Sequence, residues 1–360
     1  MERKTLAVIA LVVVVVVVVG AVAAVELSKP PSTPKAAKVT LSESGSTLLY
    51  PVFNAWKGNY SNATITTLST GSGTGISSAI AGTVIIGASD AFMSPSLASA
   101  NPGVMNIPIM ISYQYIAYNI PNFNFKLNLS GNVIAGIFMG TINNWNNSLI
   151  QQLNPGVALP NHSIIPIHRS DGSGDTFMFT SFLSKSNGTW AQKVGAGTNV
   201  NWPSVAGSLT GNGNSGIITQ MTTTPYSIGY IAATYEAQVN SAGFGIANLE
   251  NQDGQFVGAS VQNVSIAAQQ YLPLIPKNGT IALQYAPGKD SYPIADMEYV
   301  IVRQNQSSPA IASALKEFLN WAVSSDGGSS SKYLTEFNLV PLPSSVVSEV
   351  VIPLINKITG

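Results

Sequence analysis

One local pattern occurs three times in this chain: a short apolar run, a loop of glycine and hydroxyl residues, and then a helical pattern. The loops lie at residues 45–47, 71–75 and 172–176. Strands that alternate with helices are typical of α/β sheets, in which ligands bind beyond the carboxyl ends of the strands. A helix start offers free backbone N–H groups and the positive end of the helix dipole, so each junction suits an anion. The repetition therefore predicts an α/β protein with an anion site.

The third loop is the most informative, because it adds a permanent positive charge. Arg169 supplies a planar fork of N–H donors just after a β-rich run. Gly172 and Gly174 allow backbone to approach a ligand closely. Ser173 and Thr176 supply hydroxyl donors. We interpret this loop as one half of an oxyanion clamp, although a capped helix beside a surface arginine would have the same composition.

Several kinds of chemistry are excluded by the composition. The chain contains no cysteine, which rules out disulfides, thiolate catalysis and cysteine-ligated zinc. It has two histidines, His162 and His168, and the position of His168 at a strand end indicates a structural role. No glycine-rich loop matches a P-loop, a dinucleotide fingerprint or a nucleophile elbow. The 16 basic residues balance 16 acidic ones, so no net charge favours nucleic acid.

The N-terminal segment, residues 1–27, is strongly apolar. Its run from Leu6 to Val25 spans 20 residues, which at about 1.5 Å each can cross a bilayer core of about 30 Å. We expect an uncleaved anchor with the rest of the chain outside the cell, as the basic residues before the run indicate. Cleavage at Ala21–Ala24, giving a secreted protein, remains the alternative. Prolines in residues 28–38 predict a stiff linker.

Hydrophobic patterning predicts further elements and a possible surface modification. Nine Asn-x-Ser/Thr sequons permit glycosylation outside the cell. Residues 240–285 are polar and give few strong signals. Strands are expected at 39–41, 64–68, 84–86, 107–118, 164–167, 228–231 and 293–302, and helices at 48–56, 133–138, 145–153 and 346–358 and from residues 76, 177, 217 and 308.

Taken in order, the loops and their neighbours resemble one family: the phosphate-binding proteins of phosphate ABC importers, within the type II periplasmic-binding-protein fold. Each sequence block alone is weak evidence for the family, but the occurrence of so many blocks in the same order is specific. The blocks are Gly45–Thr47 with Pro51 and Trp56, Thr70–Gly73, Gly87–Asp90, Ile137–Gly140, Trp145, Leu153–Gly156, Leu159–Pro160, Arg169–Gly174, Asn212–Ile217 and Ile228–Tyr230.

The resemblance implies two α/β domains, each a mixed sheet flanked by helices, joined by crossing strands and closing on phosphate. Carried over to this sequence, residues 39–111 and 295–360 form the first domain, and residues 112–294 form the second. The crossings would lie near Ile111 and Pro293.

The resemblance also implies a set of phosphate contacts. We expect Asp90 to accept the proton that phosphate carries at neutral pH and sulfate lacks, which would discriminate between the two anions. Asp171 would orient Arg169 by an ion pair. Asp175 stands where some family members have a hydroxyl residue, and we expect either a second proton acceptor or a helix cap, with the former favoured. The implied contacts are Thr47, the Leu48 backbone, Ser72, Asp90, Arg169, Ser173, Gly174 and Asp175, supported by Ser46, Asp171 and Thr176.

The function implied is therefore a solute-binding protein, not an enzyme, that captures inorganic phosphate and delivers it to the permease and ATPase subunits of an ABC importer. We expect a monomer at the cell surface, with no metal, cofactor or nucleic acid. A phosphate-ester hydrolase would need a metal cluster or an activated nucleophile, and the sequence offers neither clearly. A structural surface-layer protein is a further alternative, and it predicts no tight binding of small anions.

Overall fold

A computed structural model describes residues 38–360, and its compact unit comprises Val39–Gly360. The expected membrane anchor at residues 1–27 and the linker at 28–38, apart from Lys38, lie outside the described residues. Within residues 38–360, no helix combines the length and the apolar character that a membrane crossing requires.

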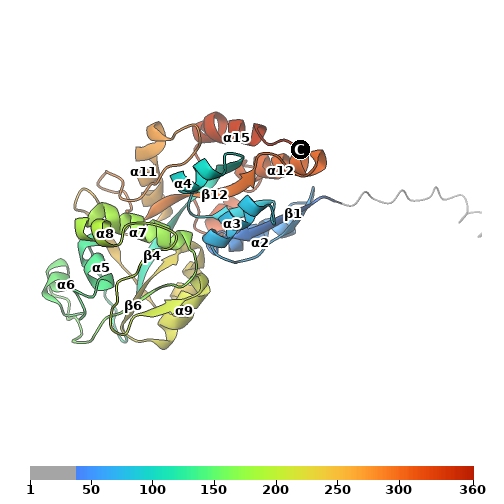
Figure 1. The fold of residues 1–360 in the computed structure, drawn as a ribbon. Coiled ribbons are helices and arrows are strands. Elements are labelled where there is room, and N and C mark those ends of the chain that lie inside the picture. The colour runs from blue at the N-terminus through green and yellow to red at the C-terminus, as the bar shows by residue number, and fades with distance from the viewer. Residues whose placement is uncertain (1–37) are drawn as a thin grey trace, which may run out of the picture. The chain divides into compact units, whose positions relative to one another are not determined.

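A mixed sheet of nine strands forms the centre of the unit (Figure 1). A three-stranded sheet, β11 (Phe256–Val257), β10 (Asn248–Glu250) and β5 (Asn128–Leu129), lies apart from it. The strands of the large sheet, in spatial order, are β2 (Thr64–Thr66), β1 (Thr40–Gly45), β3 (Ile86–Ser89), β12 (Ala295–Arg303), β4 (Val104–Asn119), β8 (Ser227–Ala232), β6 (Ile165–Arg169) and β7 (Leu209–Gly211), with β9 (Gly245–Ile246) also paired to β4.

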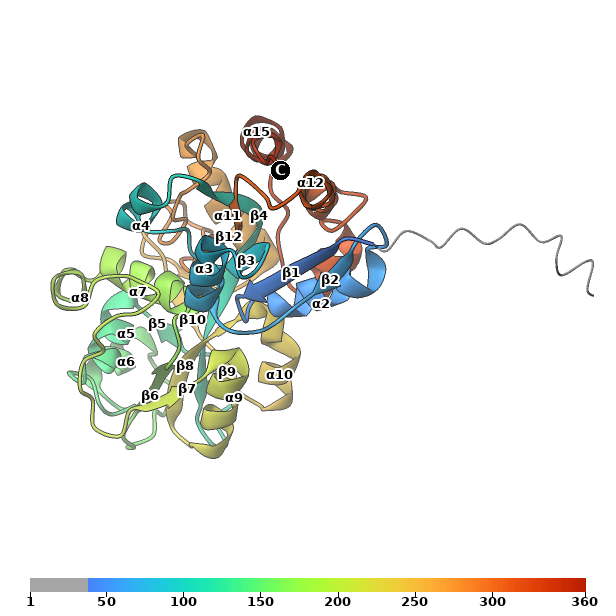
Figure 2. The same cartoon turned by 45° about the vertical axis from the view of Figure 1, so that its right-hand side comes forward.

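The long strand β4 connects the two halves of this sheet. Its first part pairs antiparallel with β12 as far as Tyr113, and its second part pairs antiparallel with β8 from Gln114 onward. The sequence explains its length, because the apolar run 107–118 is buried almost throughout. Figure 2 shows β4 passing from the half that holds β1, β3 and β12 to the half that holds β6 and β8. We refer to these as the β3 half and the β6 half.

Helices flank the sheet in both halves (Figures 1 and 2). The α-helices are α2 (Tyr50–Asn59), α3 (Ser72–Ala81), α4 (Pro95–Ala100), α5 (Gly131–Phe138), α6 (Ser148–Leu153), α7 (Gly174–Ser186), α8 (Gly188–Lys193), α9 (Gly213–Thr223), α10 (Glu236–Ser241), α11 (Val261–Tyr271), α12 (Pro309–Val323), α13 (Ser331–Glu336), α14 (Ser344–Val346) and α15 (Ile352–Asn356). Single turns of other helix types are η1 (Ala233–Tyr235), η2 (Leu272–Leu274) and the π-helical η3 (Val347–Val351).

Aromatic residues hold the helices of each half in place. In the β3 half, Trp56 of α2 packs edge-on against Phe318 and Trp321 of α12, with ring centroids 5.9 and 5.8 Å away. In the β6 half, Phe179 of α7 stacks on Tyr230 of β8 at 4.5 Å. Such contacts add to the burial of these large side chains and fix the directions in which α2 and α7 approach the sheet.

Most predicted elements are present, with shifted bounds. The predicted strand 84–86 is β3 at Ile86–Ser89, and the helix expected from residue 217 begins four residues earlier as α9, at Gly213. The predicted final helix is divided by the π-helical turn η3. Residues 240–285, which gave few signals in the sequence, contain β9, β10, β11 and α11. The strands were hard to predict because strands of two or three residues depend on pairing with distant partners and leave little local pattern.

Candidate functional site

The three glycine-rich junctions converge on one buried carboxylate, Asp90, which directly follows β3. Ser46, after β1, donates a hydrogen bond to Asp90 Oδ1. Ser72, at the start of α3, donates to Asp90 Oδ2 at 3.2 Å. From the β6 half, Gly174 packs so closely that a Cβ atom added there would lie 2.5 Å from the Cβ of Asp90. Asp90 is therefore enclosed from both halves, and it is 1% exposed.

The surroundings of Asp90 bring its titration close to neutrality. Burial is the largest cause and raises the pKa of Asp90 to about 7, and the nearby Asp175 carboxylate adds to this increase. Hydrogen bonds with Glu298 and Ser46, together with the charge of Arg169, act in the opposite direction. Asp90 can therefore act as a proton acceptor around neutral pH.

Arg169 faces Asp90 from the end of β6 and is 3% exposed. Its Nε donates to Asp171 Oδ1 at 2.7 Å, and its Nη2 forms an ion pair with the same carboxylate. Its Nη1 donates to Asp175 Oδ2 at 2.6 Å. The predicted ion pair between Arg169 and Asp171 is thus present, and a second one accompanies it. These contacts use three of the five N–H donors of the guanidinium group and leave two for a ligand.

The two carboxylates that hold Arg169 differ in their electrostatics. Burial raises the pKa of Asp171, but the hydrogen bond and charge of Arg169 outweigh it, so the net pKa lies below its ordinary value. Asp175 is 1% exposed, and there burial outweighs Arg169, so its pKa lies above the ordinary value. Asp171 is therefore the permanent counter-ion of Arg169, whereas Asp175 is the partner that can take up a proton.

The helix-cap interpretation of Asp175 is wrong. The N-cap of α7 is Ser173, whose Oγ accepts a hydrogen bond from the backbone N–H of Thr176 at 3.2 Å. Asp175 accepts instead from side chains: from Arg169, from Asn214 at 2.7 Å and from Gln114 at 3.0 Å. Its alternative role as a second proton acceptor for a ligand remains a prediction.

Thr47 lies where loops of the two halves touch. Its Oγ1 accepts a hydrogen bond from Asn214 Nδ2 at 2.8 Å, and its carbonyl oxygen accepts from Tyr235 at 2.9 Å. Beside it, the backbone N–H of Gly73 donates to the carbonyl of Gly172 at 2.8 Å. The two halves of the sheet are thus joined by polar contacts around Asp90 and Arg169.

The remaining predicted residues lie in the same place. Leu48 is fully buried two residues before α2, and its carbonyl oxygen accepts a hydrogen bond from the Thr234 hydroxyl at 3.1 Å. Thr176 shares a hydrogen bond of 2.7 Å with Tyr230, whose hydroxyl also accepts from the Arg169 backbone N–H at 3.0 Å. Thr176 therefore orients the loop through Tyr230. His168, expected to be structural, stacks on Trp202 at 4.2 Å.

Sequence reasoning missed four polar residues of this network: Gln114, Asn214, Tyr230 and Glu298. Gln114 and Glu298 each interrupt a strongly apolar strand pattern, in 107–118 and 293–302. A polar residue in a buried strand is itself a signal, because it must find a partner in the interior. Asn214 and Tyr230 belong to sequence blocks that carried the family resemblance, but their side-chain roles depend on contacts that only the fold creates.

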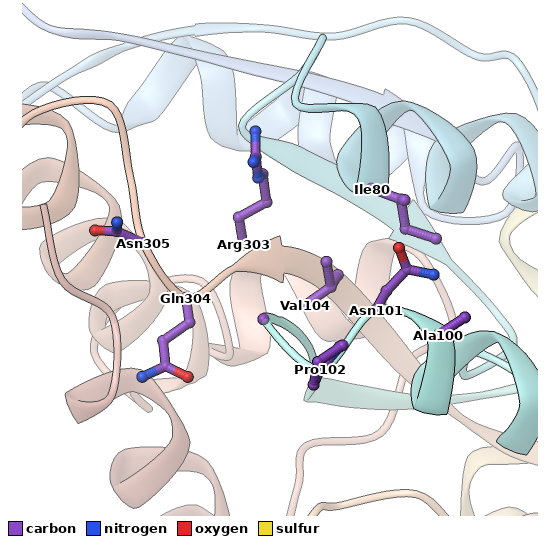
Figure 3. A pocket seen from close by; sticks show the side chains of 9 residues that line it. Ile80, Ala100, Asn101, Pro102, Val104, Arg303, Gln304 and Asn305 are labelled. Carbon is purple, nitrogen blue, oxygen red and sulfur yellow. The ribbon is translucent and has the colours of Figure 1, made fainter.

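A surface pocket of about 460 Å³ lies away from this site. Figure 3 shows Arg303, Asn305 and Asn101 among the residues that line it. Arg303 ends β12, which runs antiparallel to β3, so the pocket lies at the opposite end of β3 from Asp90. None of the predicted site residues lines it. Among residues 38–360, no group of three or more histidine, aspartate or glutamate side chains is arranged to hold a metal ion.

Comparison with known proteins gives this site its family context. Residues 30–326 match the model of the PBP superfamily domain. The phosphate-binding protein PstS of Xylella fastidiosa is 33% identical over 325 residues, which cover 89% of this chain and 86% of that protein. The PstS protein of Haemophilus influenzae is 34% identical over 322 residues, covering 88% of this chain and 93% of that protein.

This chain belongs to the PstS family of phosphate-binding proteins. A solved phosphate-binding protein from Stenotrophomonas maltophilia has the same fold, with a TM-score of 0.65, 18% identity and coverage of 87% of this chain and 93% of that one. The resemblance drawn from the sequence is confirmed, as is the α/β fold of the type II periplasmic-binding-protein class. The match to the PBP superfamily domain, residues 30–326, includes every loop of the site described above.

Proposed function

We propose that this chain captures inorganic phosphate between the β3 half and the β6 half and delivers it to an ABC importer. The observation that carries the proposal is the buried carboxylate of Asp90, which faces the N-terminus of α7 and lies near Arg169. The PstS relatives of this chain are named as phosphate-binding proteins, and they match most of its length.

The combination of donors and one acceptor suits phosphate better than sulfate. The spare N–H groups of Arg169, the hydroxyls of Ser72 and Ser173 and the backbone at Leu48 and Gly174 would donate to the anionic oxygens. Asp90 would accept the O–H that phosphate retains at neutral pH. Against sulfate the same carboxylate would face another acceptor, and a buried unpaired polar group costs about 1–3 kcal/mol, or more when it is charged. Thr47 and Asp175 complete the proposed contacts.

The fold supports a division into two domains that close on the ligand. We assign residues 39–111 and 295–360 to the first domain and 112–294 to the second, with Ile111 and Pro293 near the crossings. The partner change along β4, from β12 to β8, falls beside these positions. Closure would bring Ser46, Thr47 and Asp90 to Arg169 and the start of α7.

The cellular setting completes the proposal. The chain would act outside the cytoplasm as a monomer, held at the membrane by residues 1–27 or secreted after signal cleavage. It would dock on the permease of an importer powered by ATPase subunits. Exposed sequons, such as those at Asn146 and Asn278, are available for glycosylation. The chain would work as a carrier, so we expect no turnover of phosphate esters.

Titration calorimetry of the purified full-length chain with phosphate, arsenate and sulfate tests the proposal. We expect phosphate to bind, arsenate to compete because it is also protonated and similarly shaped, and sulfate to bind far more weakly. Equal affinity for sulfate, or no phosphate binding, would contradict the proposed function. Release of phosphate from an ester by the same preparation would instead favour a hydrolase.

A further inference from the structure

A second buried carboxyl group, that of Glu298, lies on the strand next to Asp90. Strands β3 and β12 are antiparallel, with Ser89 paired to Tyr299 and Ala88 paired to Val300. Continuing this register by one residue places Glu298 opposite Asp90. Glu298 is fully buried, and its Oε2 has no hydrogen-bond partner among residues 38–360. Burial raises the pKa of both carboxyl groups, and a hydrogen bond between them lowers the pKa of Asp90 and raises that of Glu298. The two carboxyl groups therefore belong to neighbouring strands, and both are buried.

A hydrogen bond between two carboxyl groups requires one proton on the pair, because an ionised carboxylate has acceptors alone. The contacts around each partner indicate where that proton resides. Asp90 receives hydrogen bonds from Ser46 and Ser72, which stabilise its ionised form. Glu298 receives one, from Ser112 to Oε1, and its Oε2 accepts none from residues 38–360. The less stabilised carboxylate, Glu298, is the one that should be neutral.

The surrounding charges favour the same assignment. Asp90 is faced by Arg169 from β6 and by Asp175 from α7. The hydroxyl of Tyr235, in η1, donates to the carbonyl oxygen of Thr47 in the same loop region. Glu298 is faced by Asp296 on its own strand and by Ser112 on β4, with the hydroxyl of Tyr299 nearby. Lys185 of α7 donates to the carbonyl oxygens of Ala282 and Gln284, and its charge lowers the pKa of Asp296 slightly against the larger effect of burial. Arg169, the strongest nearby positive charge, thus acts on Asp90. The titratable groups that act on Glu298 are two carboxyl groups, Asp90 and Asp296, and burial raises the pKa of Glu298 well above its ordinary value.

We propose that Glu298 is a positioning residue that keeps its proton and shares it with Asp90 in a hydrogen bond. This hydrogen bond keeps Asp90 ionised and oriented as the acceptor for the ligand's O–H. This inference rests on the proposed function. It assigns selectivity to a pair rather than to Asp90 alone, since an Asp90 without this donor would itself take up the proton. A protonated Asp90 would offer sulfate a hydrogen-bond donor and would no longer reject it.

The test compares two substitutions of similar size. Glu298→Gln keeps an N–H donor for Asp90 and an acceptor for Ser112 but cannot ionise. Glu298→Met removes the donor. Ser112→Ala is the matched control, because it removes a buried hydrogen-bond partner of Glu298 and leaves the proton on Glu298. The full-length proteins are titrated with phosphate and sulfate between about pH 6 and 9, the range that brackets the Asp90 pKa of about 7.

We expect Glu298→Met to lower the phosphate-to-sulfate affinity ratio by roughly ten- to a hundredfold near neutral pH, the worth of one charge-assisted hydrogen bond. Its phosphate affinity should recover as the pH rises and Asp90 ionises. Glu298→Gln and Ser112→Ala should retain a ratio close to that of the unaltered chain. Two outcomes would show that Glu298 does not position Asp90. In the first, Glu298→Met has the same phosphate-to-sulfate affinity ratio and the same pH dependence of phosphate affinity as the unaltered chain. In the second, Glu298→Gln changes both quantities as much as Glu298→Met does.

A spectroscopic measurement covers the case in which Glu298→Met does not fold. Difference infrared spectra of the unaltered chain and Glu298→Gln at about pH 8 should show the C=O stretch of one protonated carboxyl group that the variant lacks, because burial favours the neutral form. Absence of that band would overturn the proposal. Failure of the unaltered chain to bind phosphate would instead contradict the proposed function, so the two failures are distinguishable.

Discussion

Asn214 connects Thr47 in the β3 half to Asp175 in the β6 half through a single amide nitrogen. Its Nδ2 donates to Thr47 Oγ1 at 2.8 Å and to Asp175 Oδ2 at 2.7 Å, while its Oδ1 accepts from the backbone of Ala232 at 2.8 Å. The amide is fully buried, so each of these hydrogen bonds replaces one to water. Asn214 therefore helps to hold the two halves together without being one of the proposed ligand contacts.

Replacing Asn214 by alanine should weaken closure. The variant removes one side-chain donor from Thr47 and one from Asp175, which keeps its bonds from Arg169 and Gln114. A loss of about 1–3 kcal/mol in total should lower phosphate affinity roughly ten- to a hundredfold. Calorimetry measures the affinity, and small-angle scattering measures the change in radius with phosphate. Asn212→Ala is the control, because Asn212 is exposed and its side chain makes no cap hydrogen bond. Equal affinities for the two variants would refute a role for Asn214.

Replacing Asp90 by asparagine should reduce selectivity. Phosphate would lose a charge-assisted hydrogen bond, worth roughly 1.5–3 kcal/mol or about ten- to a hundredfold in affinity. Sulfate would lose a repulsive contact, so the affinity ratio should fall further than phosphate affinity alone. Because Asp175 could partly substitute, the double variant with Asp175→Asn belongs in the same series, and the exposed Asp253→Asn is the control. An unchanged ratio in both the single and the double variant would rule out this assignment.

Replacing Arg169 by lysine should weaken phosphate and sulfate together. The guanidinium contacts Asp171 with Nε and Nη2 and Asp175 with Nη1, and a single ammonium group cannot reproduce that fork. Breaking a buried charge network of this kind typically costs 3–5 kcal/mol when one partner is removed, and the charge-retaining lysine should lose about half of that. Competition calorimetry should show both affinities reduced with little change in their ratio. Arg303→Lys, an exposed position away from the site, provides the control.

The stability of the unliganded protein should decrease as the pH rises, in part because of Glu43. This residue lies in β1 and is 2% exposed, and burial raises its pKa from 4.5 to about 8, with a backbone hydrogen bond at Leu68 opposing the increase. The folded state therefore holds a proton that the unfolded state has already lost. The contribution of Glu43 to the free energy of unfolding is fully present below about pH 4.5 and is lost as the pH rises to about 8.

Glu43→Gln removes this titration. We expect its free energy of unfolding to vary less between about pH 5 and 8 than that of the unaltered chain, by on the order of a few kcal/mol. Denaturant unfolding at the two pH values measures the difference, and the exposed Glu349→Gln should behave like the unaltered chain. An equally steep decline in Glu43→Gln would show that other buried carboxyl groups, such as Asp296, account for the pH dependence.

Local patterns predicted the parts of this molecule that depend on neighbouring residues. The glycine-rich junctions, the buried run of β4 and the ion pair between Arg169 and Asp171 are all encoded within a few positions of sequence. Contacts between segments far apart in the sequence could not be predicted from such local patterns. The pairing of Asn214 with Thr47 joins residues 167 positions apart, and the Ser112–Glu298 contact joins residues 186 apart. Such pairs are set by sheet order, which periodicity does not specify.

The two carboxylates that hold Arg169 have a consequence for how a ligand arrives. Asp171 alone can offset the charge of the guanidinium group, and the whole chain carries equal numbers of acidic and basic residues, so little positive field extends into solvent. An anion would therefore reach the cleft by unassisted diffusion and be recognised only on contact. Association of this kind changes little with ionic strength, and the protein would take up its ligand at similar rates in dilute and in saline surroundings.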